Sequence, residues 1–222
     1  MKMFVSLAAL ALVAGSATAA TVSQWDLTGA PGDQAFTAGT AAANVSATNI
    51  TRGAGLGVSA AGNSFSSLGW TQQATDYISF GFSVDAGYQV NLENLYIGTR
   101  SSGTGPGTLG LYSSLDGFTA PLTTFVQVGT NGGAGTGFVN SVVDLSALPN
   151  ISGTIEFRVI QIGTQAANGG ATTSANGTFR LTAYFVNATF DRNLQFTGEV
   201  IPAPASIALV GLAGLVAGRR RR

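Results

Sequence analysis

The amino-acid sequence predicts an all-β protein, an antiparallel β-sandwich of jelly-roll type. Short stretches of apolar residues alternate with polar ones at a period of two, and no stretch keeps the 3.6-residue apolar period of an amphipathic helix. Loops rich in Gly, Asn and Ser separate these stretches, as in sandwich proteins with many short strands. Ten strands are predicted, at 22–27, 45–51, 77–84, 92–97, 108–113, 123–128, 138–144, 154–162, 178–186 and 194–200.

The strands follow one another between turn signals along the chain. Segments 22–27, 77–84 and 92–97 alternate most cleanly, and the Gly/Ser/Pro turn 100–107 separates the strands 92–97 and 108–113. Asp116-Gly117, a strong turn dipeptide, follows the strand that ends at 113. The inward positions of the alternating strands predict a core made of Trp25, Ile78, Phe80, Phe82, Leu95, Ile97, Phe157, Val159 and Phe179.

Composition excludes several classes of function. The 222 residues include no Cys and no His, which rules out disulfides, thiol nucleophiles, Ser-His-Asp triads and His- or Cys-ligated metals. Residues 21–201 hold five arginines against ten carboxylates, a net charge of −5. Nucleic-acid binding requires a clustered basic face, so no nucleic-acid partner is expected.

The first 19 residues predict a secretory signal peptide. Lys2 precedes an apolar run of helix formers, and Ala17-Thr18-Ala19 has the small-x-small pattern that signal peptidase recognises. Cleavage is expected after Ala19, with Ala20 as the alternative. The folded domain is therefore expected to span residues 20–201.

Residues 202–222 predict a separate C-terminal segment. Pro202-Ala203-Pro204 is followed by an apolar run, 207–217, which forms about 16 Å of helix at 1.5 Å per residue. A membrane-spanning helix needs about 20 residues, so this short helix favours transient or partial contact with the inner membrane. The cluster Arg219, Arg220, Arg221 and Arg222 ends the chain as a positive-inside stop.

This three-part architecture resembles that of bacterial PEP-CTERM sorting proteins. The resemblance rests on the signal peptide, the Pro-x-Pro of residues 202–204, the short apolar helix and the Arg tail. It implies export, recognition of the tail by a membrane-embedded exosortase, and delivery to the cell surface or extracellular matrix. The family motif has Glu between its two prolines, where this chain has Ala203.

Three kinds of site chemistry remain open. Glycoside hydrolysis needs two carboxyls about 5–10 Å apart, and nothing selects a pair from the ten present; arginine partners such as Arg158 for Glu156, or Arg180 for Asp191, are the alternative role for several of them. No cofactor is indicated. A structural calcium bound by loop oxygens is a hypothesis, but the sequence does not identify its ligands. Trp70 follows the Ser/Gly stretch 63–69, and a core position is the favoured interpretation of its aromatic ring. Stacking on a sugar ring is the alternative, for which Trp70 is the candidate residue.

The sequence therefore predicts an exported surface or matrix β-sandwich with a structural or adhesive role and no enzymatic one. Signal peptidase and an exosortase-like enzyme are the expected processing partners, and polysaccharides or matrix proteins are the expected surface partners. The alternative is a carbohydrate-binding module, and a sandwich-fold glycosidase is the third candidate.

Overall fold

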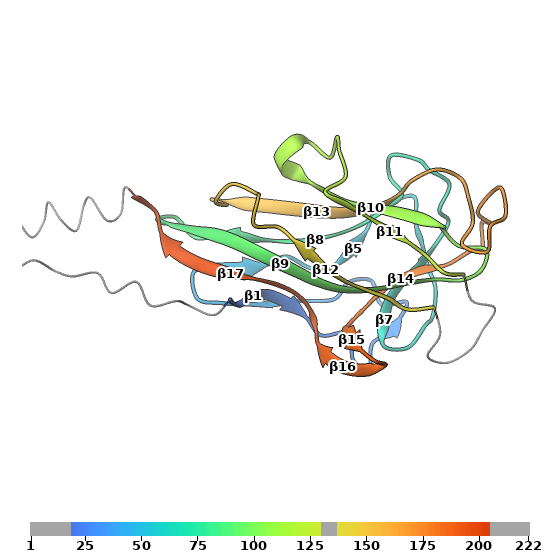
Figure 1. The fold of residues 1–222 in the computed structure, drawn as a ribbon, viewed down its shortest axis with the longest axis horizontal. Helices are drawn as coiled ribbons and strands as arrows, with labels where there is room; N and C mark the ends of the chain where they lie inside the picture. The colour runs from blue at the N-terminus through green and yellow to red at the C-terminus, as the bar shows by residue number, and fades with distance from the viewer. Residues whose placement is uncertain (1–18, 130–136, 205–222) are drawn as a thin grey trace, which may run out of the picture.

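The computed structural model describes residues 19–129 and 137–204, and these residues have an all-β fold (Figure 1). Two curled sheets form a β-sandwich-like arrangement, so the predicted fold class is confirmed at this level. The predicted signal helix and the apolar helix 207–217 lie outside the described residues. Within those residues no helix is long and apolar enough to cross a membrane.

The larger sheet has nine strands and is antiparallel except for the short β2–β7 pairing. Its path of hydrogen-bonded neighbours runs through β2 (Pro31–Gly32), β7 (Ser64–Leu68), β14 (Phe179–Thr182), β9 (Tyr88–Ser101), β17 (Leu194–Pro202), β1 (Ala20–Trp25) and β3 (Thr40–Ala41), and β12 (Val139–Asp144) also pairs with β9 and β6 (Gly57–Val58) with β7.

The smaller sheet has six strands, and a separate hairpin lies outside both sheets. The six are β11 (Thr123–Val126), β10 (Thr108–Ser113), β13 (Thr154–Gln161), β8 (Tyr77–Val84) and β4 (Val45–Ala47), with β5 (Thr51–Arg52) also paired to β8. The hairpin consists of β15 (Tyr184–Val186) and β16 (Thr189–Arg192), and a short 3-10 helix, η1 (Ser114–Asp116), follows β10.

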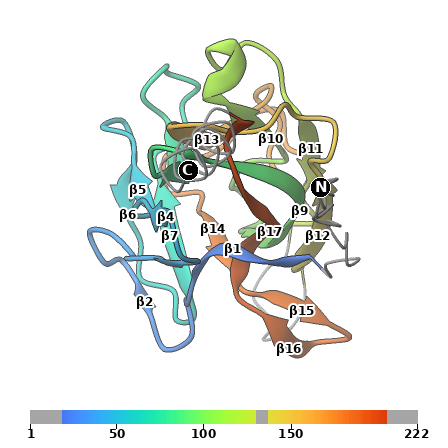
Figure 2. The same ribbon diagram turned by 90° about the vertical axis from the view of Figure 1, so that its left-hand side faces the viewer.

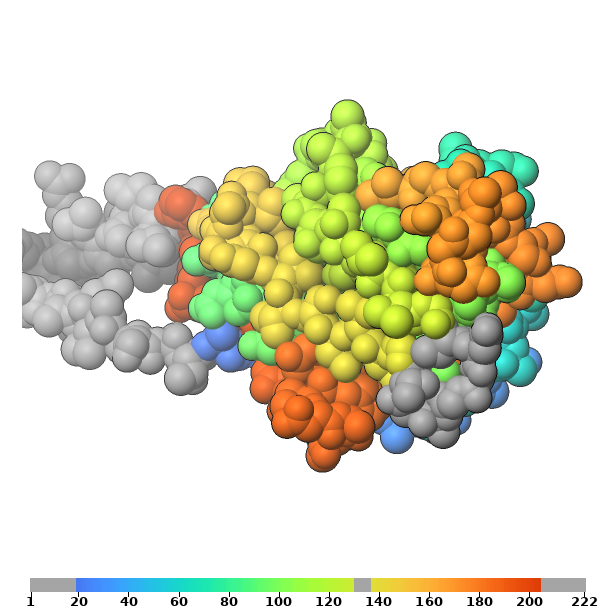
Figure 3. All heavy atoms as spheres, turned by 45° about the vertical axis from the view of Figure 1, so that its right-hand side comes forward, coloured from blue at the N-terminus to red at the C-terminus, as the bar shows by residue number. Residues whose placement is uncertain are grey.

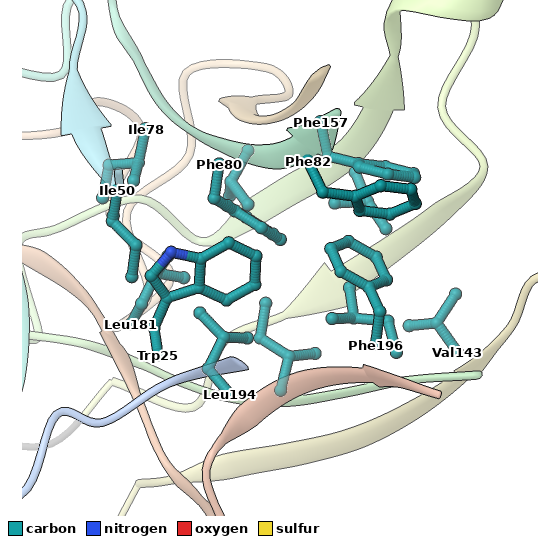
Figure 4. Close-up of a cluster of buried hydrophobic side chains, with 14 of the residues drawn as sticks. Trp25, Ile50, Ile78, Phe80, Phe82, Val143, Phe157, Leu181, Leu194 and Phe196 are labelled. Atoms are coloured by element: carbon teal, nitrogen blue, oxygen red, sulfur yellow. The ribbon is translucent and has the colours of Figure 1, made fainter. Parts of the chain in front are cut away.

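An aromatic cluster between the two sheets forms the centre of the core (Figure 4). The Trp25 ring from β1 lies edge-on to Phe80 of β8, with the ring centroids 5.5 Å apart. The ring of Phe196 in β17 packs on the ring of Phe157 in β13, with the ring centroids 4.7 Å apart. All nine residues that the sequence assigned to the core are buried, which confirms that prediction.

Strand β9 is longer than predicted because it pairs along both of its edges. It runs over 14 residues, where the sequence predicted only 92–97. One edge pairs with β12. The other edge pairs first with β17 and then with β14, so these two strands form one nearly continuous line along β9.

The predicted single strand 178–186 is wrong, because the chain leaves the edge of β9 after β14. The ladder from β14 ends where Thr182 pairs with Gly98, and the ladder to β17 resumes where Gln195 pairs with Tyr96. Between these points the chain leaves the sheet and forms the β15–β16 hairpin. The predicted strand 45–51 is likewise divided into β4 and β5.

Strand β7 was not predicted, because its Ser-Phe-Ser-Ser-Leu sequence has few apolar residues. The strand is nevertheless buried, because it pairs with β14 on one side and with β2 and β6 as well, and Arg52 packs against it. The guanidinium is 3.8 Å from the centroid of the Phe65 ring and donates hydrogen bonds to the Ser66 carbonyl and the Ser67 hydroxyl.

The two ends of the described domain lie at the same end of the molecule (Figure 1). Strand β1 pairs with β17, and Ala20 lies opposite Gly198. The last strand extends to Pro202, one residue into the segment that the sequence assigned to the tail.

Candidate functional site

The predicted processing residues lie at this shared end where they are described. Ala19 immediately precedes β1, and Pro202 pairs with Tyr88 of β9. The Ala203 N–H donates to the Gly87 carbonyl at 2.8 Å, and Pro204 is the last described residue. The arginines at 219–222 lie outside the described residues.

Trp70 is a core residue, so its predicted role in sugar stacking is corrected. Its side chain is 1% exposed, and its ring lies edge-on to Phe179 at 5.4 Å. The indole N–H donates to the Ser67 carbonyl at 3.3 Å. A ring buried and hydrogen-bonded in this way has no free face for a sugar.

The carboxylates mostly have local structural partners. Glu156 pairs with Arg158 at 2.8 Å, as expected, but Asp191 pairs with its neighbour Arg192 rather than with Arg180. The Asp191 carboxylate raises the pKa of the Arg192 guanidinium. No cluster of three carboxylates that could hold a metal ion occurs in 19–129 or 137–204.

The β15–β16 hairpin carries exposed apolar and aromatic side chains on the described surface. It stands clear of both sheets in Figures 1 and 2 and protrudes in the space-filling view of Figure 3. Its turn is made by Asn187 and Ala188, both of which have positive φ, as a two-residue hairpin turn of the primed type requires. Phe190 is 50% exposed and Val186 is 46% exposed.

Contacts to the nine-stranded sheet fix the hairpin in place. Arg192 lies 4.1 Å from the centroid of the Tyr96 ring, and the Tyr96 and Tyr184 rings meet edge-on at 5.4 Å. The Phe185 N–H donates to Oδ1 of Asn140 at 3.1 Å. The hairpin is thus held by both an aromatic–cation cluster and β12.

A hollow of about 480 Å³ lies at the base of the hairpin, and we refer to it as the hairpin hollow. Its rim carries polar and aromatic side chains, and Leu27 and Ala183, both buried, also line it. The rim residues are Asp26, Thr28, Asn63, Phe185, Phe190 and Asn193. They come from the end of β1, the segment before β7, the hairpin and the segment before β17.

Sequence reasoning missed this site because its residues are far apart in the chain. The available signal was a pair of β-prone segments, Tyr184-Phe185-Val186 and Thr189-Phe190, on either side of Asn187-Ala188, which is a hairpin pattern without the usual Asn-Gly turn. Comparison with known proteins found no matching family model, no matching curated protein and no matching solved structure.

Proposed function

We propose that the chain is an exported cell-surface or extracellular-matrix protein, a jelly-roll-type β-sandwich with an adhesive role and no catalytic one. Residues 1–19 act as the signal peptide. The segment 202–222, which resembles a PEP-CTERM tail, delivers the sandwich to the surface with transient contact to the inner membrane. The consecutive strands β8, β9 and β10 alternate between the two sheets, and this crossing supports the jelly-roll topology.

The observation that carries the proposal is the position of the chain ends. Strands β1 and β17 are neighbours, and both ends leave the same end of the sandwich. A domain attached in this way stays tethered through one end only. Its opposite end and the β15–β16 hairpin then remain accessible to a surface partner.

The processing step is tested on the full chain expressed in an exosortase-bearing bacterium. Surface and membrane fractions are analysed by mass spectrometry of the N- and C-terminal peptides. We expect a mature N-terminus at Ala20 and surface chains that lack Arg219–Arg222. A variant with four serines in place of these arginines should accumulate in the membrane fraction.

Two results would overturn the proposal. One is a cytoplasmic chain that keeps Met1, which would exclude export. The other is a surface chain that retains its arginine tail, because tail removal is what separates sorting from simple secretion.

A further inference from the structure

The hairpin hollow contains polar atoms whose hydrogen-bonding capacity is only partly used. Asp26 accepts the Thr28 N–H through Oδ1 at 2.8 Å, and Asn63 accepts the Gly29 N–H through its Oδ1 at 2.8 Å. Asn193 donates through Nδ2 to Oε1 of Gln24 at 3.2 Å. Within the described residues no bond engages Oδ2 of Asp26, Nδ2 of Asn63 or Oδ1 of Asn193.

These existing bonds orient the free atoms. Each side chain uses one polar atom to hold a backbone or neighbouring group, which fixes its rotamer and presents the other atom to solvent. The hollow therefore offers two acceptors, one of them anionic, and one amide donor. Such a set matches adjacent hydroxyl groups, each of which both donates and accepts.

The aromatic part of the hollow gives it an apolar wall. Phe185 and Phe190 meet edge-on, with centroids 6.1 Å apart, and half of the Phe190 surface is exposed. An exposed ring beside hydroxyl-binding groups suits a ligand with one apolar face and a polar perimeter. A pyranose ring has this shape, and the hollow volume is within the range of about 300–1,000 Å³ that is usual for ligand sites.

The charge around the hollow favours a neutral ligand over an anionic one. Asp26 is the one ionisable residue on the rim, and residues 21–201 carry a net charge of −5. An anionic polysaccharide would be repelled by both. We propose that the hairpin hollow binds a neutral polysaccharide, with one sugar ring against Phe190 and its hydroxyls bonded to Asp26, Asn63 and Asn193. This inference rests on the proposed adhesive function and names its ligand class.

The experiment measures binding of the purified full chain to immobilised neutral polysaccharides (dextran, xylan, galactomannan and cellulose) and to two acidic ones, alginate and polygalacturonate. Phe190→Ala removes the exposed ring of the aromatic wall, and Asp26→Asn removes the anionic acceptor while keeping its size. Val186→Ala is the matched control, because Val186 is similarly exposed on the same hairpin but does not line the hollow. Thermal unfolding of every variant checks that the fold is retained.

We expect binding to at least one neutral polysaccharide, weakened about tenfold or more by Phe190→Ala and by Asp26→Asn, which corresponds to about 1.4 kcal/mol. Val186→Ala should leave the affinity within about twofold, and Phe190→Tyr should restore it. Binding to the acidic polymers alone, equal loss in Phe190→Ala, Asp26→Asn and the Val186→Ala control, or no binding to any polymer would overturn the inference. A correctly processed surface chain that binds no polysaccharide would reject this ligand and leave the proposed function standing, whereas a chain retained in the cytoplasm would reject the proposed function itself.

Discussion

Replacement of Arg52 should produce a large loss of stability, although no carboxylate forms an ion pair with it among the described residues. Its guanidinium makes five hydrogen bonds of 2.6–3.1 Å, to the carbonyls of Gly32, Gln34 and Ser66 and to the hydroxyl of Ser67. These bonds join β5 of the smaller sheet to β2 and β7 of the larger one. Burial lowers the pKa of the guanidinium, and the Asp33 carboxylate acts in the opposite direction.

The magnitude follows from the acceptors that lose their donor. Arg52→Met keeps the apolar stem but leaves the carbonyls of Gly32 and Ser66, both on buried residues, without this donor. An orphaned buried acceptor costs about 1–3 kcal/mol, and release of a partly desolvated cation offsets some of this, so we expect a loss of about 3 kcal/mol. For a domain of this size, about 2–4 °C per kcal/mol gives a fall in Tm of about 6–12 °C.

Differential scanning calorimetry and urea unfolding of the full chain measure this loss. Arg52→Lys keeps the charge but loses the planar fork, and should fall between wild type and Arg52→Met. An arginine keeps its charge throughout the working range, so the loss should be equal at about pH 5 and about pH 9. A fall in Tm below about 2 °C for Arg52→Met would show that solvent replaces these bonds, and would refute the reasoning.

Three further substitutions, one of them with a matched control, test other parts of the structure. Gly98→Ala places a Cβ against the Ala183 carbonyl where the chain leaves the sheet, and should cost about 1–3 kcal/mol in urea unfolding; Gly62→Ala, where a Cβ meets open space, should leave the midpoint unchanged or slightly raised. Trp70→Ala should lower stability by about 3–5 kcal/mol in the same assay while polysaccharide affinity stays at the wild-type value, and lost binding in a stable variant would return Trp70 to the site. Arg158→Ala should lower the free energy of unfolding by about 1–2 kcal/mol, because its guanidinium lies 4.0 Å from the centroid of the Tyr77 ring and 3.9 Å from that of Phe118, and beside Glu156. A loss of stability that disappears in 1 M salt would contradict a cation–π contribution.

The predicted elements are most accurate for two strands of the smaller sheet. Segments 77–84 and 108–113 match β8 and β10 residue for residue, because their apolar side chains alternate and face one core. Strand β7 was missed because its Ser-rich sequence has few apolar residues, and its partner strand β14 is distant in sequence. Local composition does not indicate such a distant partner.

The candidate site was inaccessible to sequence reasoning for a related reason. Trp70 was selected for its neighbours in the chain, a Ser/Gly stretch that is typical of a loop, yet this stretch forms a buried strand and carries the indole into the core. Asp26 and Asn193 are separated by most of the domain and come together because β1 and β17 pair. A site formed by strand pairing can be predicted only once the pairing register of the strands is known.

The position of the hairpin separates stability from recognition in this fold. Strands β14 and β17 form one line along β9, and the residues between them leave the sheet, so the central ladder is nearly continuous without the hairpin. Interactions that stabilise the sandwich, such as those of Trp25 and Arg52, lie between or within the main sheets. Changes at Phe190 should therefore alter binding with little effect on Tm, and Arg52→Met should lower Tm with little effect on binding at temperatures where the chain stays folded. If both substitutions changed both properties together, the hairpin would be part of the cooperative core, and its assignment as a separable recognition element would fail.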